Sequence, residues 1–171
     1  MTLLSTTILD SDTNESLADG CVLECSKSGL SIHKRTLRCG VSAGVDELEV
    51  SNGDFRFVVL PTRGMSVHRA SYRDDSIGWK SPVNGPVHPS AVDVAEPSGL
   101  GWLDGFDELL VRCGLESNGA PEHDPETGRL IYPVHGRIGN KPAQKVTVSI
   151  EGDELTLTGV VEEIRFHFLK L

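Results

Sequence analysis

Residues 47–60 read ELEVSNGDFRFVVL and carry the clearest structural signal in the chain. Apolar and polar residues alternate on both sides of Asn52-Gly53, as they do in half-buried β-strands. Asn-Gly readily occupies the two positive-φ positions that a type I′ turn requires. We therefore predict a β-hairpin in which Leu48 and Val50 share one face of the first strand and the two phenylalanines share one face of the second.

Further strand patterns lie on both sides of this hairpin. They cover residues 21–25, 31–39, 65–72, 109–115, 145–150, 154–160 and 163–171, with a short helical turn at 102–107. Because no segment has a helical period, the sequence predicts an all-β fold, an antiparallel sandwich. The first 20 residues are rich in Ser, Thr, Asp and Asn and predict a loose N-terminal arm or capping segment, 1–20, before a domain at 21–171.

The composition argues against several classes of protein. A formal net charge of -9 disfavours a general nucleic-acid binder and attachment to anionic membranes. The N-terminus lacks the basic start of a signal peptide, and no apolar run approaches the roughly 20 residues of a membrane span, so a cytoplasmic protein is expected. Cys21, Cys25, Cys39 and Cys113 form no Cys-x-x-Cys pair, and we interpret them as buried or half-buried thiols. No phosphate-loop or metal motif is present, and we expect no metal and no cofactor.

Two long loops rich in proline and glycine, 79–105 and 116–133, have the length and composition of binding loops. Arg63 stands at the end of a predicted strand, where a guanidinium can hold sugar hydroxyls or a carboxylate; the alternative is a surface arginine in a turn. Trp102 could stack on a sugar and Asp104 could accept its hydroxyl groups. The alternative is a core tryptophan with a capping aspartate.

A third group of candidates follows these loops. Asn118 precedes a glycine, which is first of all a turn signal. His135, Arg137 and Asn140 stand close together among glycines, just before a predicted strand, so a functional and a structural reading are equally open. His68 lies within a strand pattern and is interpreted as an ordinary side chain.

Four of these stretches, taken in order, resemble an uncharacterised branch of the aldose 1-epimerase-like, or galactose mutarotase-like, superfamily. They are PTRGM at 61–65, GWKSP at 78–82, GLESNG at 114–119 and HGRI at 135–138. The resemblance begins near residue 44 and implies a supersandwich of antiparallel sheets with a sugar site on a concave face. By position, Arg63 and His135 match the arginine and histidine with which the first half of these proteins holds the sugar.

The same resemblance implies one difference in specificity. Arg137 stands where the His-Gly-Gly loop of mutarotases has its second glycine. An arginine there suggests a ligand with an additional acceptor, such as a carboxylate, sulfonate or phosphate group on the sugar.

Members of the superfamily are roughly twice as long as this chain, which resembles their N-terminal half. The matching general acid His and general base Glu would follow Leu171. Because anomer interconversion by ring opening needs both groups, we expect the complete family form to catalyse it and this chain to hold the binding residues. The alternatives are a non-catalytic carbohydrate-binding module or truncated relic, and a homo-oligomer formed through an open edge of an incomplete sheet.

Overall fold

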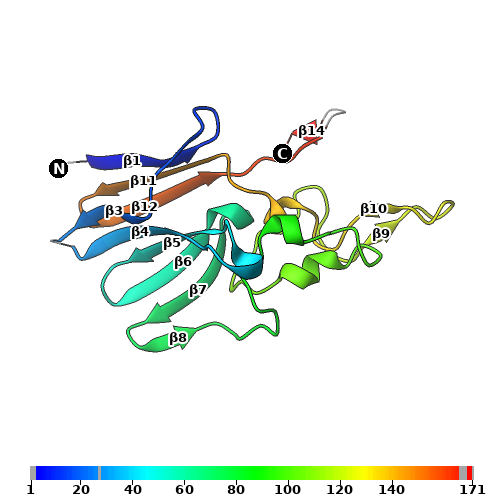
Figure 1. Ribbon diagram of the computed structural model, residues 1–171, viewed down its shortest axis with the longest axis horizontal. Helices are drawn as coiled ribbons and strands as arrows, with labels where there is room; N and C mark the ends of the chain where they lie inside the picture. Colours follow the sequence, from blue (N-terminus) through cyan, green and yellow to red (C-terminus); the bar gives the residue numbers. More distant parts are fainter. Residues whose placement is uncertain (1–2, 27, 166–168, 171) are drawn as a thin grey trace.

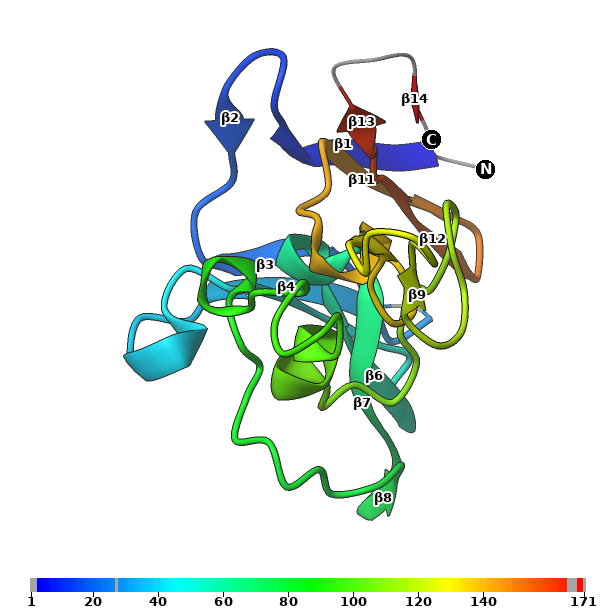
Figure 2. The same ribbon diagram turned by 90° about the vertical axis from the view of Figure 1, so that its right-hand side faces the viewer.

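Two antiparallel β-sheets stacked face to face form the body of the structure, a computed structural model that describes residues 3–26, 28–165 and 169–170 (Figures 1 and 2). The larger sheet has the order β3 (Gly20–Cys25), β4 (Leu30–Thr36), β5 (Asp46–Ser51), β6 (Phe55–Leu60), β7 (Ser66–Tyr72), β8 (Asp75–Ile77). The smaller sheet has the order β12 (Glu154–Val160), β11 (Lys145–Glu151), β1 (Leu3–Asp10), β2 (Glu15–Ser16). The predicted all-β antiparallel class is confirmed.

The remaining elements are short. Two small pairs are formed by β9 (Glu122–His123) with β10 (Leu130–Tyr132) and by β13 (Ile164–Arg165) with β14 (Leu169–Lys170). Every helical segment of the described residues is a 3-10 helix: η1 (Gly40–Ser42), η2 (Pro61–Arg63), η3 (Pro89–Ala91), η4 (Gly101–Gly105) and η5 (Ile138–Asn140). Figure 1 shows the connections between β8 and β11, coloured green to yellow, gathered beyond one end of the two sheets.

The core lies between the two sheets and follows the period-2 alternation of the strands. Leu48 and Val50 of β5 point into it, as the hairpin pattern predicted, and meet residues of the smaller sheet such as Ile8. The buried core residues are Ile8, Ile32, Leu48, Val50, Val59, Ile138, Ala143, Val146, Val148 and Val161. Because these side chains point inward, the alternate residues of β4, β5 and β7 cover the outer face of the larger sheet.

The hairpin of β5 and β6 is confirmed, but the type I′ turn is wrong. The amide oxygen of Asn52 accepts a hydrogen bond from the backbone N–H of Phe55, at 2.8 Å, so Asn52 is a corner of the turn and not a central residue. The central residues are Gly53 and Asp54, and only Gly53 has a positive φ, +93°. A positive φ at the first central position alone is the pattern of a type II′ turn.

Three other expectations need correction. The first 20 residues are not a loose arm: β1 pairs with both β11 and β2, and Ile8 is 1% exposed. Residues 109–115 form no strand: of these residues, only Leu109 and Leu110 bond to the backbone of β7, at His68 and Val67, beyond the part of β7 that pairs with β8, and the contact is an isolated bridge. Two of the four free cysteines, Cys21 and Cys39, are exposed.

The strand predicted at 163–171 is found in part, as β13 and β14. Residues 166–168 and 171 lie outside the described residues. The strand predicted at 31–39 ends at Thr36, after which the chain turns into η1.

Candidate functional site

Arg63 ends η2, directly after strand β6, and its side chain is directed into the protein. Gly64 follows with φ +62°, a left-handed conformation that reverses the chain. A Cβ atom at Gly64 would lie 2.7 Å from the carbonyl oxygen of Ile138, so the two loops meet backbone to backbone there. The arginine side chain is 0% exposed.

The buried guanidinium of Arg63 bonds to four residues on three loop segments. Its Nε donates to Glu108 Oε1 at 2.6 Å, and one terminal nitrogen donates to the carbonyl oxygen of Gly105 at 3.0 Å. The other donates to the carbonyl oxygen of Val87 at 2.9 Å and to Asn140 Oδ1 at 3.0 Å. With no exposed surface, Arg63 holds these loops in place and orients the side chain of Asn140.

A row of aromatic rings leads inward from the surface, from Trp79 to the buried Trp102 and then to His135. Trp79 is 49% exposed and lies 5.2 Å from Phe106, which stacks on Trp102 with ring centroids 4.6 Å apart. Trp102 is buried and meets the ring of His135 edge to face at 4.8 Å. The predicted helical turn at 102–107 is confirmed as η4, which places Trp102 in this row.

Three polar atoms around Trp102 are buried without a hydrogen-bond partner among the described residues: Trp102 Nε1, His135 Nδ1 and Asn140 Nδ2. Trp102 contacts His135 directly. Asn140 is oriented by Arg63 and follows Gly139, where a Cβ atom would lie 3.5 Å from Trp102 Nε1. An unsatisfied buried polar group costs about 1–3 kcal/mol, so three in one cluster is unusual for a purely structural site. We call Trp102, His135 and Asn140 the loop site.

The backbone of the loop site is held in an uncommon conformation. His135 has φ +56° and Gly136 has φ +73°. A Cβ atom at Gly136 would lie 2.6 Å from the carbonyl oxygen of Gly114 and 2.8 Å from that of Ser117. Left-handed backbone at a non-glycine residue costs about 1–3 kcal/mol and tends to occur at functional sites. The loop that contains Gly114 therefore fixes His135 by close backbone contact.

The other predicted site residues lie around this cluster. Asn118 lies on the loop whose Gly119 carbonyl oxygen accepts from the backbone N–H of His135 at 2.9 Å. The Arg137 side chain is 29% exposed and lies 3.9 Å from Glu116. Asp104 is exposed on η4. No hydrogen bond or ion pair of the described residues joins Asp104 to the loop site.

Sequence reasoning missed two polar contacts, one made by the buried Glu108 and one by the half-buried His68. Glu108 is 0% exposed and is the counter-ion of Arg63. His68 is not an isolated strand residue: its Nε2 lies 3.0 Å from Asp107 Oδ2, and Arg69 lies 2.9 Å from its Nδ1. A carboxylate directly before Leu109-Leu110 is a weak sign of a buried acid, whereas nothing in the spacing links His68 with Asp107.

Two features are absent from the described residues. No group of three or more His, Cys, Asp or Glu side chains is arranged there to hold a metal ion. No helix among them has the length and apolar character to cross a membrane.

This chain is similar to known proteins both in sequence and in structure. The family model described as a domain of unknown function, DUF4432, matches residues 42–171. No curated protein matches the chain. A candidate aldose 1-epimerase from Klebsiella pneumoniae, known from its crystal structure, is 27% identical with a TM-score of 0.85. The match covers 99% of this chain and 45% of that one, so the chain spans less than half of its length, and the predicted resemblance to the aldose 1-epimerase-like superfamily is confirmed.

Proposed function

This chain belongs to the DUF4432 family, whose function is unknown, and we propose that it binds a carbohydrate at the loop site. One observation carries the proposal: Trp102, His135 and Asn140 each keep a buried polar atom without a partner among the described residues. Buried polar groups that the protein leaves unsatisfied are available to a ligand. The likeness to a candidate aldose 1-epimerase supports a sugar as that ligand.

The three groups suit the chemistry of a sugar. The indole N–H of Trp102 and the amide NH₂ of Asn140 donate hydrogen bonds, and His135 Nδ1 donates or accepts according to its tautomer. Sugar hydroxyls accept and donate in turn. Aromatic rings give a sugar an apolar surface to pack on, and Trp79, which is half exposed, begins the aromatic row. A few placed polar groups beside aromatic side chains are typical of a small-molecule site.

The positive charge of Arg137, beside the loop site, favours a sugar with an acidic substituent. Arg137 lies 3.9 Å from Glu116, beyond hydrogen-bond distance, and keeps part of its side chain exposed. Its planar guanidinium can take a carboxylate or a phosphate with two parallel hydrogen bonds. Equal affinity for a neutral hexose and the corresponding hexuronate would contradict this preference.

Catalysis of anomer interconversion is proposed separately from sugar binding. The reaction needs one group that protonates the ring oxygen and another that removes the proton of the anomeric hydroxyl, both within hydrogen-bond reach. We assign that activity to the complete family form and sugar binding to this chain. Mutarotation of each bound sugar, followed by polarimetry, measures the catalytic step independently of affinity.

The binding step is tested by calorimetry with a panel of neutral and acidic hexoses. Wild type should bind at least one of them, and His135→Ala and Asn140→Ala should each weaken binding about tenfold or more, the value of one lost hydrogen bond in a desolvated site. His123→Ala, which changes an exposed histidine of β9, is the matched control. Unchanged binding in both loop-site variants would remove the assignment.

A second candidate function is self-association through β12. This strand is the edge of the smaller sheet, and Leu155 and Leu157 line a hollow together with Phe57, Val59 and Met65. An unprotected strand edge beside apolar side chains favours pairing with another copy. Sedimentation velocity distinguishes the two candidates, since a species that stays monomeric at high concentration would exclude this one.

A further inference from the structure

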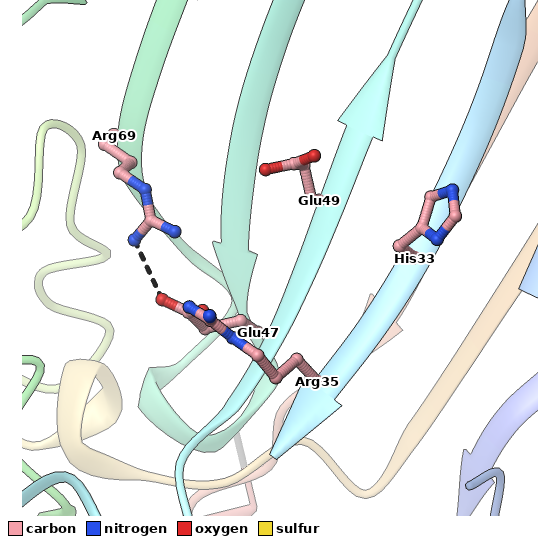
Figure 3. Close-up of a pocket in the computed structure, with 5 residues that line it drawn as sticks. All are labelled: His33, Arg35, Glu47, Glu49 and Arg69. Carbon is pink, nitrogen blue, oxygen red and sulfur yellow. Dashed lines mark hydrogen bonds and ion pairs between the residues drawn. The ribbon is translucent and has the colours of Figure 1, made fainter. Parts of the chain in front are cut away.

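The outer face of the larger sheet carries a polar hollow of about 310 Å³, opposite to the core (Figure 3). It is lined by His33 and Arg35 of β4, Glu47 and Glu49 of β5, and Arg69 of β7. These residues alternate with core residues along their strands, so the pattern that buries one face of the sheet displays charged side chains on the other. We call these five residues the outer-face hollow.

The hollow is organised around one buried carboxylate. Glu47 is 4% exposed and receives hydrogen bonds on both oxygens. Arg35 donates to Oε2 through Nε at 3.0 Å and through a terminal nitrogen, and Arg69 donates to Oε1 at 2.8 Å. Figure 3 shows the two arginines converging on Glu47 from β4 and β7. The carboxylate thus holds two guanidinium groups side by side and offsets their repulsion.

Glu47 is ionised in this arrangement. Burial alone would raise its pKa, but the hydrogen bonds and positive charges of Arg69 and Arg35 outweigh that effect and lower the pKa below its ordinary value. The two guanidinium groups are therefore fixed by charge-assisted hydrogen bonds, which are shorter and stronger than neutral ones.

The outward sides of both arginines are open to solvent. The side chains of Arg35 and Arg69 are 61% and 47% exposed, although each binds Glu47. Each guanidinium has five N–H donors in a planar fork, more than its contact with Glu47 uses. His33 and Glu49 are exposed and directly opposite each other across β4 and β5. The hollow therefore offers fixed donors on one side and a carboxylate with an imidazole on the other.

We propose that the outer-face hollow binds a small hydroxylated carboxylic acid, such as a sugar acid. Its carboxylate receives hydrogen bonds from Arg35 and Arg69, and its hydroxyl groups donate to Glu49 and meet His33. The planar fork of a guanidinium matches a carboxylate in two-bond geometry. Two arginines and two glutamates give the lining no net charge with His33 neutral, which suits a monoanion with donor hydroxyls better than a dianion.

This inference is independent of the proposed function, because the hollow shares no residue with the loop site. The arginines of the two regions also differ in exposure: Arg63 is 0% exposed, whereas Arg35 and Arg69 face solvent. One region can therefore bind a ligand when the other does not, and each is tested by its own variants.

The experiment is an NMR titration of the 15N-labelled chain with sodium glucuronate at millimolar concentration. The backbone amides of β4, β5 and β7 around the hollow should shift, in wild type and equally in His135→Ala, which leaves the hollow intact. Glucose has the hydroxyl groups without the carboxylate, and acetate has the carboxylate without the hydroxyl groups. Each should bind at least about tenfold more weakly than glucuronate. Inorganic phosphate should bind more weakly than glucuronate.

Two variants locate the ligand. Glu49→Gln and Arg35→Gln should each weaken glucuronate binding about tenfold, as read from the amides of β4, β5 and β7, and both change exposed side chains, so the fold is retained. Glu151→Gln, an exposed glutamate of the smaller sheet, should bind like wild type. The proposal is overturned if glucuronate leaves the β4, β5 and β7 amides unmoved, if both hollow variants bind like wild type, or if phosphate binds as tightly as glucuronate.

Discussion

The loop site and the outer-face hollow use the same residue types in opposite ways. Behind the loop site, Arg63 and Glu108 are buried and paired with each other, while neutral polar atoms of the loop site are left without a partner among the described residues. In the outer-face hollow the buried carboxylate of Glu47 is satisfied and the exposed arginines keep free donors. Burial thus makes one arginine part of the framework and leaves two others available to a ligand.

The largest effect should come from breaking the buried pair. Glu108→Gln leaves the fully buried guanidinium of Arg63 without its charged partner. Loss of one partner of a buried ion pair costs about 3–5 kcal/mol, so the free energy of unfolding, measured with urea, should fall by that amount.

The contrasting variant is Arg73→Ala, which removes an exposed pair with Asp54. An exposed pair contributes about 0–1 kcal/mol, so its effect should be much smaller. Comparable losses in both variants would mean that Arg63 is not the framework residue described above.

The next effect concerns the backbone of the loop site. In Gly136→Ala the new methyl group would overlap the carbonyl oxygens of Gly114 and Ser117, at a residue whose φ is +73°. The strain should cost about 2 kcal/mol or more and displace His135, so both stability and sugar affinity should fall.

Gly128→Ala is the matched control, because Gly128 has nearly the same φ, +68°, and no atom lies within 4 Å of the place that a methyl group would take there. It should lose only about 1 kcal/mol and keep its sugar affinity. Equal behaviour of the two variants in both measurements would argue against close backbone contact at the loop site.

A smaller, pH-dependent effect should appear in the outer-face hollow. The folded pKa of Glu47 is lowered, so its contribution to stability is complete above the ordinary value of 4.5 and is lost as the pH falls below it. Glu47→Gln should therefore be about 1–2 kcal/mol less stable than wild type at pH 7, and this difference should shrink as the pH falls below 4.5. A difference that stays constant down to about pH 3 would contradict an ionised, arginine-bound Glu47.

The smallest effect on stability should come from Trp102→Phe. The change removes an N–H group that no described residue accepts, and it keeps an aromatic ring against Phe106. The smaller ring leaves a cavity, whereas loss of a buried N–H without a partner removes a cost, so the two contributions oppose each other and the free energy of unfolding should change by less than about 1 kcal/mol, while sugar affinity should still fall. A large loss of stability would show that the indole N–H has a structural partner.

Local patterns in the sequence were sufficient for much of the fold. Alternation located β5 and β6, and the same alternation located β11 and β12. It failed at residues 109–115, where a loop with strand-like alternation makes isolated bridges, among them Leu110 with Val67 of β7, and no continuous ladder. It also failed for β1, LLSTTILD, whose apolar residues come in adjacent pairs and do not alternate with polar ones, although Ile8 is deeply buried. Strand pairing depends on distant partners, which a local pattern does not contain.

The candidate site could be predicted only in part. The motifs singled out Trp102, His135 and Asn140, which the structure brings together. They also singled out Arg63 as a direct ligand, because a motif gives the position of an arginine and not the depth of its side chain. The His68–Asp107 contact joins residues 39 positions apart and depends on the path of the intervening loop. Only the tertiary fold shows that these two side chains meet.

The most direct test follows the two tryptophan side chains by NMR during titration with the sugar that binds most tightly. Trp79 Nε1 already donates to the carbonyl oxygen of Glu108 at 3.1 Å, whereas Trp102 Nε1 has no acceptor among the described residues. The indole N–H signal of Trp102 should move downfield as it acquires an acceptor, with a much smaller shift for Trp79. A bound sugar that leaves the Trp102 signal in place would contradict carbohydrate binding at the loop site.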